Sequence, residues 1–159
     1  MFRLNAARTV SRSLNLAGKR FYAEAAPSGF LQLQFALPHE TVFAGSKVTQ
    51  VNLPAQSGRI GILANHVPTV EQLTPGVIEV FEGTQSKKFF VSGGFAAMQP
   101  DSTLCITSVE AFPLDSFSQE NVRSLLSDAK SKASSSDERV AAEAAIQIEV
   151  LESLQSALK

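Results

Sequence analysis

Few of the side chains that commonly perform catalysis or bind metals occur in this sequence. Its 159 residues include two histidines, His39 and His66, and one cysteine, Cys105. A metal site would need both histidines together with carboxylates, and no ligand spacing in the sequence supports one. His66, in an Asn-His-Val-Pro segment, is more simply a structural turn residue than a ligand or base. Cys105 has no neighbouring base, which favours a strand residue over a reactive thiol, and a lone cysteine excludes an intrachain disulfide.

The carboxylates and glycines also match no standard catalytic or nucleotide-binding motif. Glu71, Glu79 and Glu82 are scattered rather than paired, so an acid/base pair of carboxylates is unsupported. The segment of residues 45–47 lacks the upstream glycine and the residue order of a Walker A loop. The patterns G-x-G-x-x-G, G-x-S-x-G and H-E-x-x-H are absent. We therefore expect no catalytic residue, no metal and no cofactor.

The charged residues are unevenly distributed, although the formal net charge of the whole chain is only −1. Residues 1–22 contain five basic side chains and no acid, which leaves nine basic and fifteen acidic side chains elsewhere. A basic, acid-free N-terminus with serines and interspersed apolar residues is typical of a mitochondrial presequence. The segment Arg20-Phe21-Tyr22 before Ala23 resembles a processing site of the matrix peptidase, so we expect cleavage between Tyr22 and Ala23. A disordered basic tail or a nucleic-acid-binding arm is the alternative.

The rest of the chain has the composition of one modest globular unit, since 44% of all residues are hydrophobic. No apolar run reaches the roughly 20 residues that cross a bilayer, so we expect no direct membrane insertion. The acidic balance after residue 22 argues against nucleic acid as a partner, because phosphate binding requires clustered Lys and Arg. Residues 23–29, which are small and contain a proline, are expected to form a lead-in.

Short apolar segments separated by glycine and proline turns predict a β-sandwich over residues 30–112. Leu31, Leu33, Phe35 and Leu37 alternate with polar or small residues, as in a half-buried strand. Further strand candidates are residues 41–43, 47–53, 59–63, 77–81, 87–91, 95–98 and 103–107. About nine short strands without long helical patterns between them favour an antiparallel sandwich over βαβ units.

The composition changes in residues 113–159, where glycine is absent and the only proline is Pro113. Apolar residues recur at helical spacing over residues 122–133 and again over 140–158. The short connection between the two predicted helices indicates an antiparallel hairpin. The expected fold class is therefore α+β, with an N-terminal antiparallel β-sandwich followed by a C-terminal antiparallel two-helix hairpin.

Both predicted helices have candidate start signals. Ser116 with Gln119, and Ser135 with Glu138, have the spacing of a capping box, in which each side chain bonds the other residue's backbone N–H. The alanines between residues 141 and 145 leave room for close approach of the partner helix.

Three segments resemble the signatures of a single family. Residues 58–68 read G-R-I-G-I-L-A-N-H-V-P, residues 73–77 read L-T-P-G-V, and residues 91–95 read V-S-G-G-F before Q-P at 99–100. These segments resemble the G-x-x-G-I-L-x-x-H-x-P, L-x-P-G-hydrophobic and V-S-G-G-hydrophobic motifs of the delta subunit of mitochondrial F-type ATP synthase, the counterpart of bacterial and chloroplast epsilon. The likeness covers residues 30–159.

This resemblance implies a non-catalytic central-stalk (rotor) subunit that links the gamma shaft to the c-ring, so that proton-driven rotation is coupled to ATP synthesis. The implied partners are the gamma subunit, the mitochondrial epsilon subunit and the c-ring, with one copy of the chain in a large hetero-oligomer. The implied location is the matrix side of the mitochondrial inner membrane. The alternative is a freestanding mitochondrial β-sandwich that binds a small ligand or peptide.

The resemblance also implies two contact regions, for which fold maintenance remains the alternative role. The loop that would face the c-ring comprises Gln56, Ser57, Gly58 and Arg59. The residues that would face gamma are His66, Val67, Val70 and Glu71. In bacterial relatives, an acidic residue often occupies the position of Arg59.

One motif of the bacterial relatives is incomplete in this chain. Leu114 and Asp115 match the start of the ATP-binding pattern [IL]-D-x-x-R-A, but Ser118 and Gln119 replace its arginine and alanine. Without the guanidinium, no side chain of this motif can pair with a phosphate. We therefore expect no ATP binding and interpret Asp115 as a helix-start residue.

Overall fold

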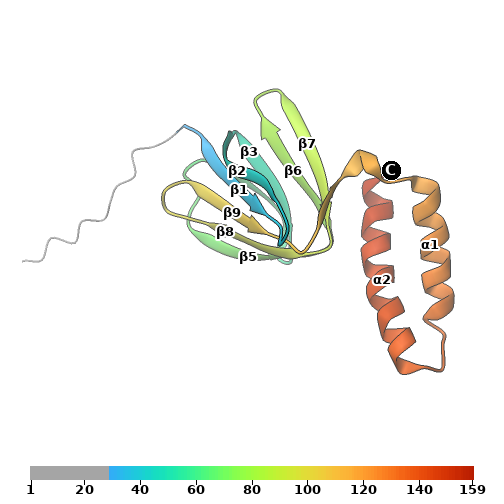
Figure 1. Ribbon diagram of the computed structural model, residues 1–159. Coiled ribbons are helices and arrows are strands. Elements are labelled where there is room, and N and C mark those ends of the chain that lie inside the picture. The colour runs from blue at the N-terminus through green and yellow to red at the C-terminus, as the bar shows by residue number, and fades with distance from the viewer. Residues whose placement is uncertain (1–28) are drawn as a thin grey trace, which may run out of the picture.

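The computed structural model describes residues 29–159. The predicted presequence, the cleavage site between Tyr22 and Ala23, and all of the lead-in except Gly29 lie outside the described residues. The described chain forms a ten-stranded, strongly curled sheet followed by a helical hairpin that stands beside one end of the sheet (Figure 1). The expected fold class, a β-sandwich followed by two helices, is confirmed.

The strands are β1 (Leu31–Ala36), β2 (Thr41–Val48), β3 (Gln50–Ala55), β4 (Gly58–Leu63), β5 (Thr69–Leu73), β6 (Gly76–Glu82), β7 (Gln85–Val91), β8 (Gly94–Met98), β9 (Thr103–Thr107) and β10 (Ala111–Pro113). A short 3-10 helix, η1 (Leu114–Ser116), leads into α1 (Gln119–Lys132) and α2 (Glu138–Ala157).

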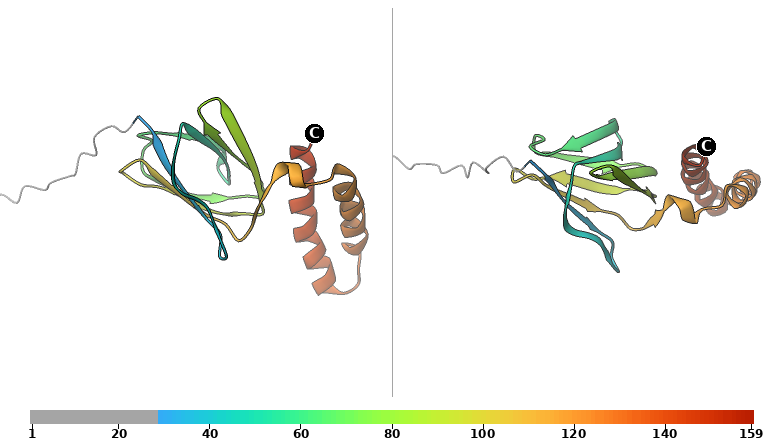
Figure 2. Two further views of the ribbon diagram at one scale, coloured as in Figure 1. Left: turned by 45° about the horizontal axis from the view of Figure 1, so that its top comes forward. Right: turned by 90° about the horizontal axis from the view of Figure 1, so that it is seen from above.

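Strand β3 is the point where the sheet changes direction. The strand order is β10-β7-β6-β3-β5-β8-β9-β1-β2, and β4 also pairs with β3. The start of β3 pairs with β6, as in Val51 opposite Val80, whereas its last residue, Ala55, pairs with Leu73 of β5. One strand thereby joins two halves that fold over each other, which Figure 2 shows from two further directions. All neighbours are antiparallel except β1 and β9, which run parallel.

The main core lies between the two halves of the curled sheet. Leu31, Leu33 and Phe35 are fully buried while the glutamines between them are exposed, so the alternation predicted for this strand is confirmed. The ring of Phe89 on β7 meets Phe35 on β1 and Phe43 on β2 edge to face, at centroid distances of 6.0 and 5.9 Å. Such aromatic pairs stabilise a core beyond the area that they bury.

The structure divides residues 41–55 differently from the sequence prediction. β2 continues through Gly45 and Ser46 to Val48, and the break falls at Thr49. The register against β1 shifts here, because Leu33 lies opposite Ser46 whereas Gln34 lies opposite Ala44. A bulge therefore absorbs the glycine that suggested a turn. The short strands β5 and β10 were not predicted.

The two helices pack side by side as the predicted hairpin (Figure 1). Both predicted capping boxes are wrong. Ser116 lies in η1 and donates to the Pro113 carbonyl at 2.6 Å, so it is not at the start of α1. Asp137 caps α2 by accepting from the backbone N–H of Arg139 at 2.9 Å. Its carboxylate lies next to the first free N–H groups, whereas Ser135 is two residues further away.

A second apolar cluster attaches the hairpin to the outer face of the sheet. Its buried members are Phe90 on β7, Val122 on α1 and Leu154 on α2. Ser153 of α2 also donates a hydrogen bond of 2.6 Å to the Pro75 carbonyl in the turn between β5 and β6. The hairpin is thus packed against the sheet rather than extended from it.

Candidate functional site

A tight, exposed turn joins β3 to β4. Gln56 and Ser57 form a two-residue connection, with Ala55 paired to Gly58, and the residues from Gln56 to Arg59 are exposed. The backbone N–H of Gln56 donates to the Gln72 carbonyl at 2.8 Å, and the Ser57 hydroxyl donates to Glu71 Oε2 at 3.0 Å. The turn is therefore bonded directly to strand β5.

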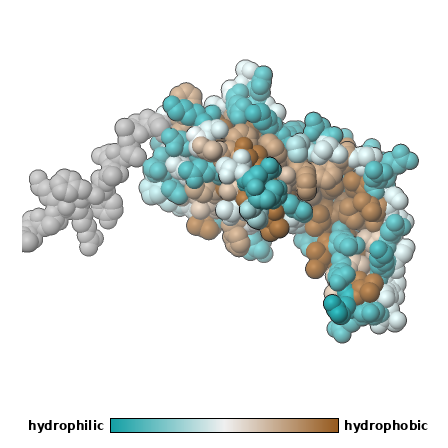
Figure 3. Space-filling view, in the orientation of Figure 1, coloured by the Kyte–Doolittle hydropathy of each residue, from teal (hydrophilic) through white to brown (hydrophobic). Residues whose placement is uncertain are grey.

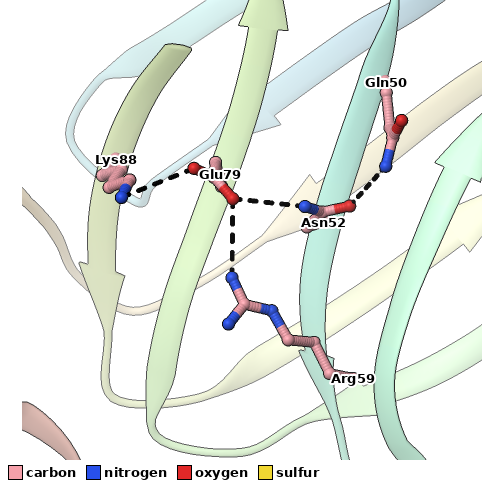
Figure 4. Close-up of polar contacts among 5 residues, drawn as sticks. All are labelled: Gln50, Asn52, Arg59, Glu79 and Lys88. Carbon is pink, nitrogen blue, oxygen red and sulfur yellow. Dashed lines mark hydrogen bonds and ion pairs between the residues drawn. The ribbon is translucent and has the colours of Figure 1, made fainter. Parts of the chain in front are cut away.

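The Arg59 side chain folds back along the sheet instead of leaving the turn. Its guanidinium lies 3.5 Å from Glu79 Oε2 on β6, and Lys88 Nζ on β7 lies 3.5 Å from the other oxygen, Oε1 (Figure 4). Asn52 donates to Glu79 Oε2 at 3.2 Å, and Gln50 donates to Asn52 Oδ1 at 2.7 Å. The charge of Arg59 is therefore already paired within the chain, although 65% of its side chain is exposed.

Strand register explains why these polar residues meet. Gly61, Asn52, Glu79 and Lys88 lie opposite one another across β4, β3, β6 and β7. A Cβ atom on Gly61 would lie 3.1 Å from both Asn52 Oδ1 and Gln50 Nε2, so this glycine makes room for the amide pair. Gln50, Asn52 and Lys88 were not among the site residues predicted from the sequence. The alternation of Gln50 and Asn52 with Val51 and Leu53 could have indicated an outward-facing row, but no such alternation marks Lys88, which follows Lys87.

The loop between β4 and β5 presents His66 and Val67. His66 is half-buried, and its Nδ1 lies 2.9 Å from the Val67 carbonyl, to which a protonated Nδ1 donates. The Val67 side chain is 69% exposed, and Val70 on β5 is 73% exposed. Large apolar side chains exposed to this degree close together indicate an interaction surface.

Glu71 does not share this surface. Successive residues of a strand point to opposite faces of the sheet, so Glu71 lies on the face opposite Val70, where it accepts from Ser57. Pairing of β5 with β8 places Ala97 opposite Val70 and Phe95 opposite Gln72. Phe95, 57% exposed, extends the apolar area and was missed by the sequence analysis. We call Val67, Val70, Phe95 and Ala97 the β5–β8 surface.

A second exposed apolar region lies on the hairpin. Leu125 on α1 and Ile146 on α2, which are 55% and 66% exposed, line a groove of about 440 Å³ between the helices, together with Val150 and Leu151. Leu125, Val150 and Leu151 also line the adjoining hollow against Phe112 at the edge of the sheet. Figure 3 shows apolar residues gathered over the hairpin and its junction with the sheet.

The residues of the incomplete nucleotide motif are separated by the structure. Leu114 and Asp115 line a cavity of about 670 Å³ between β7 and the end of α2, with Lys87 and Lys88 on its wall. Ser118, in place of the motif's arginine, is the N-cap residue of α1 and does not line this cavity.

Within residues 29–159, no three His, Cys, Asp or Glu side chains are grouped as metal ligands. No helix in that part of the chain is both long and apolar enough to cross a membrane.

Comparison with protein families identifies both parts of the chain. Residues 30–111 match the family model described as the β-sandwich domain of the ATP synthase delta/epsilon chain. Residues 117–156 match the C-terminal domain described for the fungal epsilon subunit of F1F0-ATP synthase.

Comparison with individual proteins gives full-length similarity. The chain is 73% identical to the mitochondrial ATP synthase subunit delta of Kluyveromyces lactis and 69% identical to that of Saccharomyces cerevisiae, over 100% of both chains in each case. It resembles a chain in the cryo-EM structure of the Euglena gracilis mitochondrial ATP synthase (OSCP/F1/c-ring), with 31% identity, a TM-score of 0.81 and 87% of each chain covered. A chain of the Tetrahymena thermophila central stalk/c-ring structure shares the fold, with 14% identity and a TM-score of 0.59 over 81% of this chain and 96% of that one.

Proposed function

The chain belongs to the ATP synthase delta/epsilon chain family, and we infer that it is a subunit of the central stalk of mitochondrial ATP synthase. We propose that it is a non-catalytic component, present as one copy in the hetero-oligomer. In this role it links the gamma shaft to the c-ring, so that proton-driven rotation is coupled to ATP synthesis. Its place is at the matrix side of the mitochondrial inner membrane, which it reaches after removal of residues 1–22.

The observation that carries this proposal is the direct bonding between two exposed regions. A subunit that transmits torque needs two contacts joined by a stiff connection. The family resemblance assigns the exposed β3–β4 turn to the ring and the loop and strand that carry Val67 and Val70 to gamma. The bonds from Gln56 to Gln72 and from Ser57 to Glu71 join the turn to the strand that carries Val70. A β-sheet with a single continuous core resists the deformation that would dissipate the torque.

The hairpin groove is suited to a third partner, the mitochondrial epsilon subunit. Its rim residues Leu125 and Ile146 are exposed although apolar, and it continues into the hollow beside Phe112. A partner that covered both would contact the hairpin and the sheet together. Binding there would also oppose separation of the hairpin from the sheet.

Nucleotide binding is not part of the proposed function. The cavity beside Asp115 has three lysines on its wall, Lys87, Lys88 and Lys159, but no arginine from the motif position, which Ser118 occupies. Calorimetric titration with ATP at millimolar concentration should give no saturable signal.

Copurification from mitochondria tests the proposal against the alternative of a freestanding binding module. An affinity-tagged chain should bring gamma, epsilon and c with it, and its N-terminus by mass spectrometry should be Ala23. Recovery of a monomer outside any large complex would favour the freestanding module, and an intact Met1 would refute the presequence.

Two matched substitutions then assign the surfaces. Val70→Glu should weaken association with gamma and leave epsilon bound, because Val70 is central to the β5–β8 surface. Ile146→Glu should do the reverse, because Ile146 belongs to the hairpin groove. Both side chains are more than half exposed, so neither change should unfold the chain. Loss of both partners in both variants, or of neither, would refute the assignment.

A further inference from the structure

We propose that Ser102 is a positioning residue that holds the loop of residues 64–68 in the conformation that docks on gamma. The proposal rests on the function inferred above, because it concerns the loop that carries His66 and Val67. Ser102 lies in a different part of the chain, in the turn between β8 and β9.

The backbone provides the first observation. Asn65 and Ser102, with φ of 60° and 63°, are the only residues other than glycine with positive φ among residues 29–159. Asparagine tolerates this left-handed conformation, but serine adopts it at a cost. Such conformations persist where the surrounding structure enforces them, and they occur frequently at functional sites.

The second observation is that these two residues bond to each other. The backbone N–H of Asn65 donates to the Ser102 hydroxyl at 3.0 Å, and the same hydroxyl donates to Asn65 Oδ1 at 3.2 Å. Ser102 is only 3% exposed, although it is polar. A single hydroxyl therefore acts as donor and acceptor toward one residue of the loop, which fixes the backbone and side chain of Asn65 together.

Ser102 is itself fixed to the sheet. Its carbonyl accepts from the backbone N–H of Gln32 on β1 at 2.9 Å, and Asp101 accepts from the N–H of Thr103 at 3.1 Å. The loop, by contrast, has no strand pairing between Leu63 and Thr69. The Ser102 hydroxyl is thus a direct link from the rigid sheet to the residue that precedes His66.

This link restrains the loop before it binds, so the loop loses less conformational entropy when it docks. Val67 is 69% exposed, so packing within the chain does little to restrain it. Immobilising a mobile loop on binding opposes association, and a loop already held in its bound conformation avoids that loss. The two hydrogen bonds to Asn65 therefore offset the cost of placing a serine in this backbone conformation. Glycine would fit the conformation without strain but could not bond to Asn65.

Two variants of the full mature chain separate the effect of losing the Ser102 hydroxyl from the effect of the backbone strain at this residue. Ser102→Ala removes the hydroxyl and keeps the unfavourable backbone conformation, whereas Ser102→Gly removes both. Ser153→Ala is the matched control, because it deletes another serine hydroxyl with a long-range bond, to Pro75, away from the loop. The measurements are hydrogen exchange of the Asn65 amide and the affinity for the isolated gamma subunit.

Both Ser102 variants should exchange the Asn65 amide faster and bind gamma about tenfold more weakly, equivalent to about 1.4 kcal/mol. Ser153→Ala should leave both quantities unchanged. Unchanged exchange in the Ser102 variants would refute the link, and faster exchange with unchanged affinity would refute its role in docking. Ser102→Gly keeps the test valid if Ser102→Ala folds poorly.

A third variant distinguishes failure of this inference from failure of the proposed function. Val67→Asp alters the docking surface directly and leaves Ser102 in place. If it abolishes gamma binding while the Ser102 variants bind normally, the positioning role alone is refuted. If Val67→Asp also binds normally, the loop is not the gamma contact, and the inference fails with that assignment.

Discussion

Single residues in this protein are constrained mainly by what lies directly opposite them on a neighbouring strand. Gly94 begins β8 with a φ of 149°, and a Cβ atom there would collide with the Thr107 carbonyl of β9. Glu79 is held by partners from three other strands. In both cases the neighbours come from other strands of the sheet.

The first prediction concerns Gly94. Gly94→Ala should lower the free energy of unfolding by about 3 kcal/mol, because it combines backbone strain with a clash against the chain. Gly83→Ala is the control, since Gly83 also has a positive φ, 65°, but has open space around it. It should cost only about 1 kcal/mol. Urea unfolding measures both, and equal losses would show that the collision is relieved by a small shift.

The second prediction concerns the Glu79 network. Glu79→Gln keeps an oxygen that accepts from Asn52 but loses the ion pairs with Arg59 and Lys88. Those cations are 65% and 51% exposed, so solvent screening limits the expected loss of stability to about 0.5–1 kcal/mol. The loss should shrink as salt is added.

Glu152→Gln is the control for that measurement. It removes one pair with Lys130 in which both side chains are more than half exposed, and it should have almost no effect. A loss at Glu79 that is independent of salt would contradict an electrostatic origin.

At the scale of elements, periodicity predicted the presence of strands and helices better than the residues at which they begin and end. Burial confirms the alternation over β1. It supports the helical stripes only in part, because Val122, Leu126 and Ala129 are buried on α1 and only Ala144 and Leu154 are buried on α2. The short strand β5 was missed because three of its five residues are polar and Val70, one of its two apolar residues, is exposed. The predicted helix starts were wrong because a capping residue must lie where the chain turns into the helix. Ser116 belongs to η1, and α1 begins only at Gln119.

The third prediction concerns the interface between the helices. Ala144 is 1% exposed on α2, which packs mostly against α1. Ala144→Leu should destabilise the hairpin by about 1–3 kcal/mol, because the interface has no space for a larger side chain. Ala145→Leu places the same residue on the exposed side of the same turn and should be neutral. Helical circular dichroism during thermal unfolding compares the two variants, and equal behaviour would contradict close helix packing.

At the scale of the whole molecule, residues 29–159 form two apolar clusters, which differ in whether they need both the sheet and the hairpin. The larger cluster consists entirely of residues from the sheet and its loops. The smaller one needs both parts, because Phe90 belongs to the sheet while Val122 and Leu154 belong to the hairpin. The sandwich can therefore keep the larger cluster buried without the hairpin. The smaller cluster becomes exposed when the hairpin and the sandwich are separated.

The fourth prediction follows from this asymmetry. A fragment of residues 29–113 should unfold cooperatively, with a stability reduced by about 2 kcal/mol through exposure of Phe90. A fragment of residues 114–159 should be largely unfolded, because most helical stability in proteins comes from packing of an apolar face, and Val122 and Leu154 of the hairpin pack against Phe90 of the sheet. Circular dichroism and urea titration measure both, and a fully helical isolated hairpin would contradict the prediction.

The sequence by itself determined the fold class, the order of sandwich and hairpin, and the family. These follow from periodicity and from motifs within short segments, which a chain carries before it folds. Tertiary structure decided which residues meet: Glu79 with Arg59 and Lys88, Ser57 with Glu71, and Ser102 with Asn65 across 37 positions. Alternation tells which residues face outward, but it does not tell which strands become neighbours. That choice depends on how the whole sheet closes over its core, and therefore the contact surfaces became visible only in the folded chain.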